Sequence, residues 1–148
     1  NGYLFVANNR VLAEIDPYND QVVWKDHSLN GNISDLIYDT AKNLLYAIYN
    51  TTNGSEIVVA DPENGNIVGE INLDFTTPSV CFSPITGLVY VANTYNESIT
   101  VINGTRVVSS IKIPLNPTAL AVANNLVVHR WRDNYQERLL FKPQNHSL

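Results

Sequence analysis

Several residue types and patterns are scarce in this 148-residue chain, and each absence narrows its possible functions. Only 16% of the residues are charged, below the ~25% of typical soluble domains. The net charge of -5 disfavours a nucleic-acid-binding protein. No apolar run approaches the ~18 residues of a membrane-spanning helix. Because the chain has no Met and begins at Asn1, we expect a processed product or a segment of a longer protein.

Residues for catalysis or metal binding are also scarce. The single cysteine, Cys81, cannot form a disulfide within the chain and lies in an apolar, strand-like run, so we expect an inert core thiol. His27, His129 and His146 are not spaced as metal ligands with another His, Cys or acidic residue. The sequence has no Ser-His-Asp order and no phosphate-binding loop. We therefore expect no catalytic residue, no metal site and no cofactor.

An internal repeat organises most of the sequence. Residues 87–93 (Gly-Leu-Val-Tyr-Val-Ala-Asn) recur as residues 2–8 (Gly-Tyr-Leu-Phe-Val-Ala-Asn) and, more loosely, as residues 43–49. Each copy is followed by a second apolar run, a turn and two further apolar runs. The second runs end at one repeat position, occupied by Asp16, Asp61 and Asn103. This recurrence predicts turn-capping side chains and not a catalytic pair.

Four short β-rich runs per repeat, with no helical periodicity, predict an all-β fold of β-propeller blades. Each blade is a four-stranded antiparallel sheet. The middle runs are almost continuously apolar, as expected where neighbouring sheets cover both faces of a strand. One blade cannot bury both of its faces alone, so each blade requires a neighbour.

Residues 89–93 (Val-Tyr-Val-Ala-Asn), 98–103, 106–111 and 116–122 together resemble the YVTN family of β-propeller repeats. The resemblance is close across residues 87–122, weaker before them, and is lost after Val128. Family members are typically exported or surface-layer-associated proteins, usually seven-bladed, and are not enzymes by default. The resemblance therefore implies an extracellular or cell-surface location.

The repeat predicts about three and a half blades in an open arc. Residues 1–128 contain a partial blade at 2–24, blades at about 33–73 and 79–113, and the start of another at 118–128. Known propellers close with about 4 to 8 blades. We therefore expect either a part of a larger, possibly seven-bladed ring or an arc completed by another copy, with neighbouring blades as partners.

Asn-x-Ser/Thr acceptor triplets for N-glycosylation are more frequent than chance predicts. This composition would give about three, and six are present: Asn32, Asn50, Asn53, Asn96, Asn103 and Asn145. The excess favours an exported protein, although Asn-rich turns before Thr-rich strands can generate such triplets by themselves. In a four-stranded blade, Asn32, Asn50, Asn53 and Asn96 fall at the face where propellers usually bind ligands, and Asn103 falls at the opposite face. Glycans on the ligand-binding face would hinder the access of small substrates to it, which weighs against an enzyme.

A few side chains remain to be assigned from the sequence. Trp24 lies on an outer-strand run, and we expect it to cover a sheet edge. Asp39 is expected to begin the inner hairpin turn, as Ser83 does. In propeller enzymes the catalytic groups lie in the central channel, on the inner strands. The inner strands of this chain offer only three polar residues for such a site, Asp35, Ser79 and Thr118.

The carboxyl-terminal residues 129–148 differ in character from the repeat region. They carry four Lys+Arg and two Asp+Glu and include the basic-aromatic cluster of Arg130, Trp131, Arg132 and Tyr135. This cluster could stack on a base or sugar or contact an acidic partner. The alternatives are degenerate last strands with charges at an exposed edge, or an altered reading frame after Val128.

We predict a non-catalytic extracellular propeller module for cell-surface structure, adhesion, or recognition of an unknown protein or carbohydrate ligand. The first alternative is a fragment of a propeller enzyme, such as a lactonase or a quinoprotein-type dehydrogenase. The second is a decayed or truncated reading frame. A membrane span and a nucleic-acid partner are not expected.

Overall fold

The protein has the predicted all-β fold, in a computed structural model that describes all residues except 1, 27–28, 30, 124–125, 133–136 and 144–148. Side chains are described as far as residue 123. The described residues contain thirteen strands and no helix, and the strands form four antiparallel sheets. Among these residues, no helix has the length and apolar character needed to cross a membrane.

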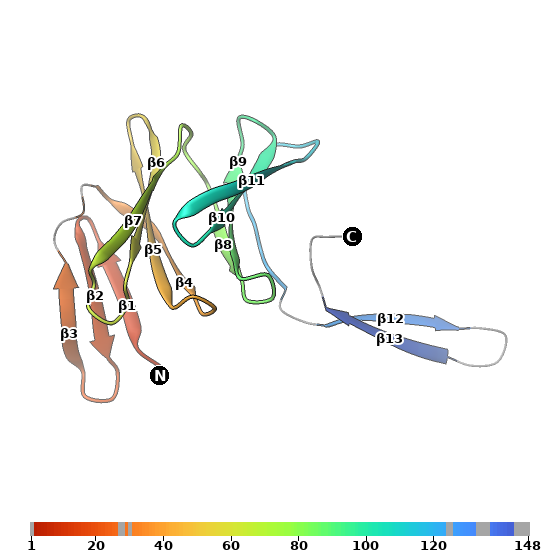
Figure 1. Ribbon diagram of the computed structural model, residues 1–148, viewed down its shortest axis with the longest axis horizontal. Helices are drawn as coiled ribbons and strands as arrows, with labels where there is room; N and C mark the ends of the chain where they lie inside the picture. Colours follow the sequence, from red (N-terminus) through yellow and green to blue (C-terminus); the bar gives the residue numbers. More distant parts are fainter. Residues whose placement is uncertain (1, 27–28, 30, 124–125, 133–136, 144–148) are drawn as a thin grey trace.

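The sheets follow one another along the chain (Figure 1). The first sheet contains β1 (Leu4–Asn8), β2 (Val11–Asp16) and β3 (Gln21–Asp26). The second sheet contains β4 (Ile33–Asp39), β5 (Leu44–Thr51), β6 (Gly54–Ala60) and β7 (Ile67–Asn72). The third sheet contains β8 (Val80–Ser83), β9 (Leu88–Asn93), β10 (Ser98–Asn103) and β11 (Arg106–Lys112). A final hairpin pairs β12 (Leu126–Arg132) with β13 (Glu137–Pro143).

Each of the first three sheets is an up-and-down meander in which neighbours along the chain are hydrogen-bonded neighbours. The second and third sheets therefore have the strand order of a propeller blade, with β4 and β8 as the first strands. The first sheet has three strands, and among the described strands β1 pairs only with β2. The three sheets form an open arc, the arrangement predicted from the repeat.

Left-handed backbone positions recur with the repeat and explain why its turn residues recur. Gly2, Asn43 and Gly87, each just before the second strand of its repeat, have φ values of 74°, 53° and 70°. Glycine and asparagine adopt this conformation at the lowest cost. Because this turn has the same geometry in each repeat, each second strand begins at the same repeat position. Equivalent residues therefore face the same side of each sheet.

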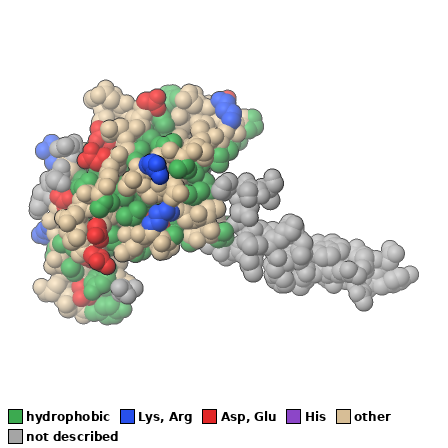
Figure 2. Space-filling view, in the orientation of Figure 1, with side chains coloured by type: hydrophobic (Ala, Val, Ile, Leu, Met, Phe, Trp, Pro, Cys, Tyr) green, Lys and Arg blue, Asp and Glu red, His purple; other side chains and the backbone are tan. Residues whose placement is uncertain are grey.

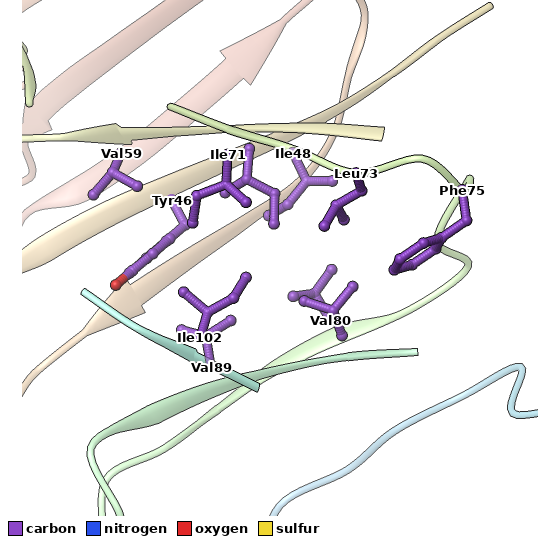
Figure 3. Close-up of a cluster of buried hydrophobic side chains, with 11 residues drawn as sticks. Tyr46, Ile48, Val59, Ile71, Leu73, Phe75, Val80, Val89 and Ile102 are labelled. Carbon is purple, nitrogen blue, oxygen red and sulfur yellow. The ribbon is translucent and has the colours of Figure 1, made fainter. Parts of the chain in front are cut away.

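Two hydrophobic clusters form the core of the described residues, one between the first and second sheets and one between the second and third. The cluster between the second and third sheets is drawn in Figure 3, where Tyr46, Ile48 and Ile71 point toward Val89 and Ile102. The cluster between the first and second sheets includes Leu12, Leu45, Ala47, Val58 and Ala60. The middle strands β5 and β9 are buried along most of their length, because both of their faces are covered. This explains their continuous apolar sequences.

Side chains also cross between sheets by donating hydrogen bonds to turn carbonyls. Trp24 Nε1 donates to the carbonyl oxygen of Pro62 at 2.9 Å, and Lys42 Nζ donates to that of Gly87 at 2.6 Å. The expectation that Trp24 covers a sheet edge was therefore incomplete. Its indole packs against Gly65 and joins the first sheet to the second.

Residues 114–123 follow the third sheet and form no strand, although the repeat predicts a first strand beginning at Thr118. The segment lies against the third sheet, where the backbone N–H of Leu120 donates to Ser79 Oγ at 2.9 Å. Thr94 Oγ1 also donates to the carbonyl oxygen of Pro117 at 2.7 Å. A first strand would need the next strand of its blade as a partner, but among the described strands β12 pairs only with β13. The segment therefore has no strand partner there.

Charged side chains are few on the face drawn in Figure 2 and lie among apolar and neutral polar side chains. The acidic ones lie mostly over the first two sheets. Charged side chains are few because only 16% of the residues are charged. Strand faces that pack against a neighbouring sheet also carry apolar side chains.

Candidate functional site

A polar groove lies between the second and third sheets, at the rim where a turn of each sheet meets the link that joins β7 to β8. Its volume is about 450 Å³. The β5–β6 turn, the β9–β10 turn and the link of residues 73–79 supply its lining, which consists of Thr52, Asn53, Gly54, Asp74, Phe75, Thr76, Tyr95 and Asn96. We call this feature the loop-face groove.

The link is held against the β5–β6 turn by backbone hydrogen bonds. Leu73 N donates to Ser55 O, and Ser55 N donates to Phe75 O, each at 2.9 Å. Close approach requires glycine at position 54, where φ is +137° and an added Cβ would lie 2.2 Å from Leu73 O. The glycine of the Asn53-Gly54-Ser55 triplet is therefore a structural requirement of the groove wall.

Ser55 connects the same turn to the inner side of the arc. Its fully buried hydroxyl donates to Asn50 Oδ1 at 2.6 Å and accepts from Thr77 N at 2.9 Å. Thr77 Oγ1 in turn donates to the carbonyl oxygen of Ser79 at 2.9 Å. The position of the groove is thus fixed by a chain of side-chain hydrogen bonds from the second sheet to the start of the third.

The β9–β10 turn forms the opposite wall of the groove. Asn93 Oδ1 accepts from Asn96 N at 3.2 Å, and Lys112 Nζ donates to the carbonyl oxygen of Asn96 at 2.6 Å. These bonds hold the turn, whereas the Tyr95 side chain is 79% exposed. The turn therefore presents an aromatic ring to solvent from a fixed backbone.

The groove offers amides, hydroxyls, one carboxylate and an exposed aromatic ring. Asn53, Asn96, Thr52 and Thr76 can donate or accept hydrogen bonds, and the ring of Tyr95 supplies an apolar surface with a polar end. Such a lining is suited to binding a polar, uncharged ligand.

A second, smaller cavity lies between the first strands of the second and third sheets. Its volume is about 200 Å³, and Ser34, Asp35, Asn50, Thr77 and Ser79 contribute its polar lining. Desolvation raises the pKa of the Asp35 carboxyl, and the backbone N–H of Leu36, which donates to Oδ1 at 2.9 Å, offsets part of this rise. The structure thus brings together Asp35 and Ser79, two of the three inner-strand polar residues singled out from the sequence.

The structure places five of the six acceptor asparagines in loops or at strand ends. Asn53 and Asn96 line the loop-face groove and are exposed. Asn50 is exposed at the end of β5, and Asn32 is exposed just before β4, beside Gly31, which contacts Tyr49. Asn103 is exposed at the β10–β11 turn, at the other end of the sheet. Asn145 lies outside the described residues.

Most turn assignments agree with the structure. Asp16 Oδ1 accepts from Tyr18 N at 2.9 Å and Asp61 Oδ1 accepts from Glu63 N at 2.9 Å. Asp39 Oδ1 caps the inner hairpin turn by accepting from the backbone N–H groups of residues 41 and 42, each at 2.8 Å, and Ser83 Oγ accepts from Thr86 N at 3.3 Å.

The thiol of Cys81 differs from expectation because it is only half-buried. It lies on the outward face of the third sheet, lining a cavity there. Partial burial raises the pKa of this thiol, so the reactive thiolate is disfavoured.

His27 and His146 lie outside the described residues, and only the backbone of His129, in β12, is described. Tyr135 also lies outside them, while Arg130, Trp131 and Arg132 are on the strand β12. In the described part, no three His, Cys, Asp or Glu residues are grouped so as to hold a metal ion.

Sequence reasoning missed Tyr95, Asp74, Phe75 and Thr76 as groove residues. The available signal was weak: the loop at residues 51–55 breaks the repeat, and Tyr95 has no aromatic counterpart in the loop between β1 and β2. The link residues were missed because only the fold brings residues 73–79 against the two turns.

Solved structures with a similar fold support the assignment of the sheets as blades. The chain matches the Kuenenia stuttgartiensis hydrazine synthase with a TM-score of 0.64 and 15% identity, over 94% of this chain and 46% of that one. It matches BamB from Moraxella catarrhalis with a TM-score of 0.62 and 18% identity, over 86% of this chain and 37% of that one. Both are β-propeller proteins. The fold is that of a partial β-propeller.

These similarities establish the fold alone, because the identities are low. The propeller chain described here spans less than half the length of either matched protein. No protein-family model matches the sequence, and no curated protein is similar to it.

Proposed function

We propose that this propeller segment is a non-catalytic extracellular recognition module that binds a polar ligand at its loop-face groove. The supporting observation is the groove itself. Two turns and a link from neighbouring blades are fixed by hydrogen bonds around a surface of amides, hydroxyls and the exposed ring of Tyr95. Propellers present such loops at one face and change their ligands by changing the loops.

The proposed ligand class is an uncharged glycan or a glycan-like polar surface. Sugars offer hydroxyl groups to amide side chains and an apolar face to an aromatic ring. The extracellular location is supported by the resemblance to the YVTN family and by the exposed acceptor triplet at Asn103, at the end of its sheet opposite the groove.

A glycan-array experiment with the purified 148-residue chain tests the proposal. Tyr95→Ala is expected to remove binding to the neutral glycans that the wild-type chain retains. Tyr18→Ala is the matched control, because Tyr18 is 84% exposed on the β2–β3 turn at the opposite end of its sheet. Absence of glycan binding by the wild type, or equal loss in both variants, would contradict a glycan site in this groove.

The location is tested separately by expression through the secretory pathway of a glycosylating host. Mass spectrometry is expected to show an occupied Asn103, and Asn103→Gln should remove this modification. A bare Asn103 in secreted material would remove this support for the extracellular assignment.

A second candidate, a fragment of a propeller enzyme, is favoured by the cavity that contains Asp35 and Ser79. A carboxyl with a raised pKa beside a hydroxyl is a feature of acid-base sites. This candidate predicts lactone hydrolysis that is lost in Asp35→Asn and kept in Asp20→Asn, a substitution on the β2–β3 turn. No hydrolysis of a lactone panel would rule against the lactonase form of this alternative.

A further inference from the structure

Glu14 interrupts the internal repeat at a core position. The second and third sheets carry Val59 and Val101 there, each two residues before the Asx residue that ends its apolar run. Both valines are buried, with exposed fractions of 0% and 2%. Glu14 is only 6% exposed, so it is buried as well. The first sheet thus places a carboxylate where the other two sheets need only an apolar side chain.

The polar contact at this end of the sheet interface also differs between the repeats. Between the second and third sheets, Tyr46 donates to the carbonyl oxygen of Gly104 at 2.7 Å. Between the first and second sheets, the equivalent carbonyl belongs to Pro62 and accepts from Trp24 Nε1 at 2.9 Å. Phe5 takes the repeat position of Tyr46 and pairs with Glu14 across the strands. The tyrosine hydroxyl of the repeat is therefore missing beside Glu14.

A cavity of about 370 Å³ lies beside Glu14, between the first and second sheets. It is at the rim opposite the loop-face groove, where the β4–β5 and β6–β7 turns lie. Its volume is within the range of about 300 to 1,000 Å³ that is typical of small-molecule sites. Three aromatic rings, two carboxylates and an amide contribute to its lining: Tyr3, Phe5, Tyr38, Glu14, Glu63 and Asn43. We call this cavity the acidic pocket.

The Glu14 carboxylate has no cationic partner in the described part of the chain. The one ion pair found there joins Lys42 to Asp39. The neighbouring donor, the indole N–H of Trp24, already donates to a turn carbonyl. A buried carboxylate without a cation beside it is costly to the folded state. The cavity therefore contains a negative charge that its own residues leave uncompensated.

The charges around Glu14 are also negative. Burial raises the pKa of its carboxyl, and the carboxylates of Asp16 and Glu63 raise it further. Glu63 is exposed at the β6–β7 turn and lines the same cavity. A cation bound between Glu14 and Glu63 would offset this repulsion, whereas an anion would increase it.

Aromatic rings indicate which kind of cation suits the pocket. The Phe5 ring stacks on Tyr38, with ring centroids 5.9 Å apart and an interplanar angle of 29°. The hydroxyl group of Tyr38 donates to Asn43 Oδ1, which holds this ring in place. Aromatic rings attract organic cations through their negative faces, whereas Ca²⁺ prefers six to eight oxygen ligands. Two carboxylates among aromatic rings therefore suit an organic cation better than a metal ion.

We propose that the acidic pocket binds an organic ammonium group, with the Glu14 carboxylate as its counter-ion and the aromatic rings around it. The ligand is a small amine or quaternary ammonium compound, or a lysine side chain that carries the same group. The proposal gives a role to a buried carboxylate that the repeat does not explain. It concerns the other rim of the sheets and does not depend on glycan binding at the loop-face groove.

Titration of the ¹⁵N-labelled 148-residue chain with choline, followed by nuclear magnetic resonance, tests the proposal. The indole N–H signal of Trp24 and the amide signal of Glu14 are expected to shift, with a Kd of about 10 mM or lower. The neutral isostere 3,3-dimethyl-1-butanol has carbon in place of the charged nitrogen and should bind about tenfold more weakly or worse. The amide signal of Tyr95 should stay unchanged, which separates this site from the loop-face groove.

Substitution of Glu14 tests the role of the buried charge. Glu14→Gln should weaken choline binding by about tenfold or more, because it removes the charge and keeps the shape of the side chain. Loss of folding is not expected, since an uncompensated buried charge is removed, and the urea midpoint checks this. Glu63→Gln should have a smaller effect, because Glu63 is exposed. Glu97→Gln, at an exposed turn of the third sheet, is the matched control and should bind as the wild type does.

Further ligands distinguish the sources of the ammonium group from each other and from a metal ion. Tighter binding of n-butylammonium than of a blocked Gly-Lys-Gly peptide would identify a free amine, and the reverse would identify a lysine side chain. Calcium chloride is the metal probe. Equal binding of choline and its neutral isostere, unchanged binding by Glu14→Gln, or shifts with Ca²⁺ but with no ammonium probe would each overturn the proposal. Absence of binding by every probe would overturn it as well.

Discussion

The hydroxyl group of Tyr46 donates a hydrogen bond to the carbonyl oxygen of Gly104 at 2.7 Å and so connects the second sheet to a turn of the third. The Tyr46 ring lies in the hydrophobic cluster between the two sheets, with its oxygen at one end of the cluster (Figure 3). One side chain thus supplies both apolar packing and a polar contact that fixes the relative position of two blades. Desolvation, together with the nearby Asp39 carboxylate, raises the pKa of this phenol, so it remains a donor.

Replacing Tyr46 by Phe should lower the free energy of unfolding by about 1 to 2 kcal/mol, because the Gly104 carbonyl loses its donor while the ring packing remains. Urea unfolding followed by circular dichroism measures the change. Tyr18→Phe is the control and should have little effect, since Tyr18 is exposed. An unchanged midpoint for Tyr46→Phe would show that the bond contributes nothing to stability.

Replacing Gly54 by Ala should lower the free energy of unfolding by about 2 kcal/mol or more, because the new Cβ would collide with backbone atoms of the link. Gly87→Ala is the matched control. It also has a left-handed φ, of +70°, but its Cβ would meet side-chain atoms at 3.5 Å and beyond. We expect a cost of about 1 kcal/mol there. Equal costs at the two positions would contradict the close approach at the groove wall.

Replacing Ser55 by Ala should lower the free energy of unfolding by about 1 to 3 kcal/mol, because the buried N–H of Thr77 loses its acceptor. Hydrogen exchange of the Thr77 amide should become faster. The same substitution removes the acceptor triplet at Asn53, so Asn53→Gln is the control that removes only the triplet. Slow exchange at Thr77 in Ser55→Ala would mean that another group holds the link.

Replacing Glu14 by Gln should raise the free energy of unfolding near neutral pH. Desolvation raises the pKa of the Glu14 carboxyl above its ordinary 4.5, the Trp24 side chain offsets part of this, and Asp16 and Glu63 raise it further. The folded state therefore binds its proton more tightly than the unfolded state, and stability falls as pH rises above 4.5 through the folded-state pKa.

The gain from Glu14→Gln should accordingly be present at about pH 7 and shrink toward about pH 4, where the wild-type carboxyl is protonated in both states. Denaturant titrations at the two pH values measure the difference. Glu97→Gln, at an exposed turn residue, is the control. A gain of equal size at both pH values would indicate a packing effect instead of a charge effect.

Much of the local structure could be predicted from the sequence because it depends on neighbouring residues. The recurring Gly or Asn before each second strand, as at Gly2 and Gly87, sets a left-handed turn by its own backbone preference. Asp39 and Asp61 cap turns two or three residues away. Strand order follows from these short turns, since consecutive strands pair with one another.

The contacts between sheets could not be predicted in this way. Trp24 and Pro62 are 38 residues apart in the sequence, and nothing near either of them indicates their hydrogen bond. The extended segment after Pro117 also differs from its repeat assignment, because its ladder partner must come from elsewhere in space. The link residues of the loop-face groove were missed for the same reason.

The sequence by itself determined the all-β class and the blade repeat, because short β-rich apolar runs and the local turn chemistry between them specify both. Only the tertiary structure decided which side chains meet in the groove and which sheet faces are buried against one another. The physical reason is that burial depends on which sheet packs against which, and packing is a property of segments that are distant in the chain.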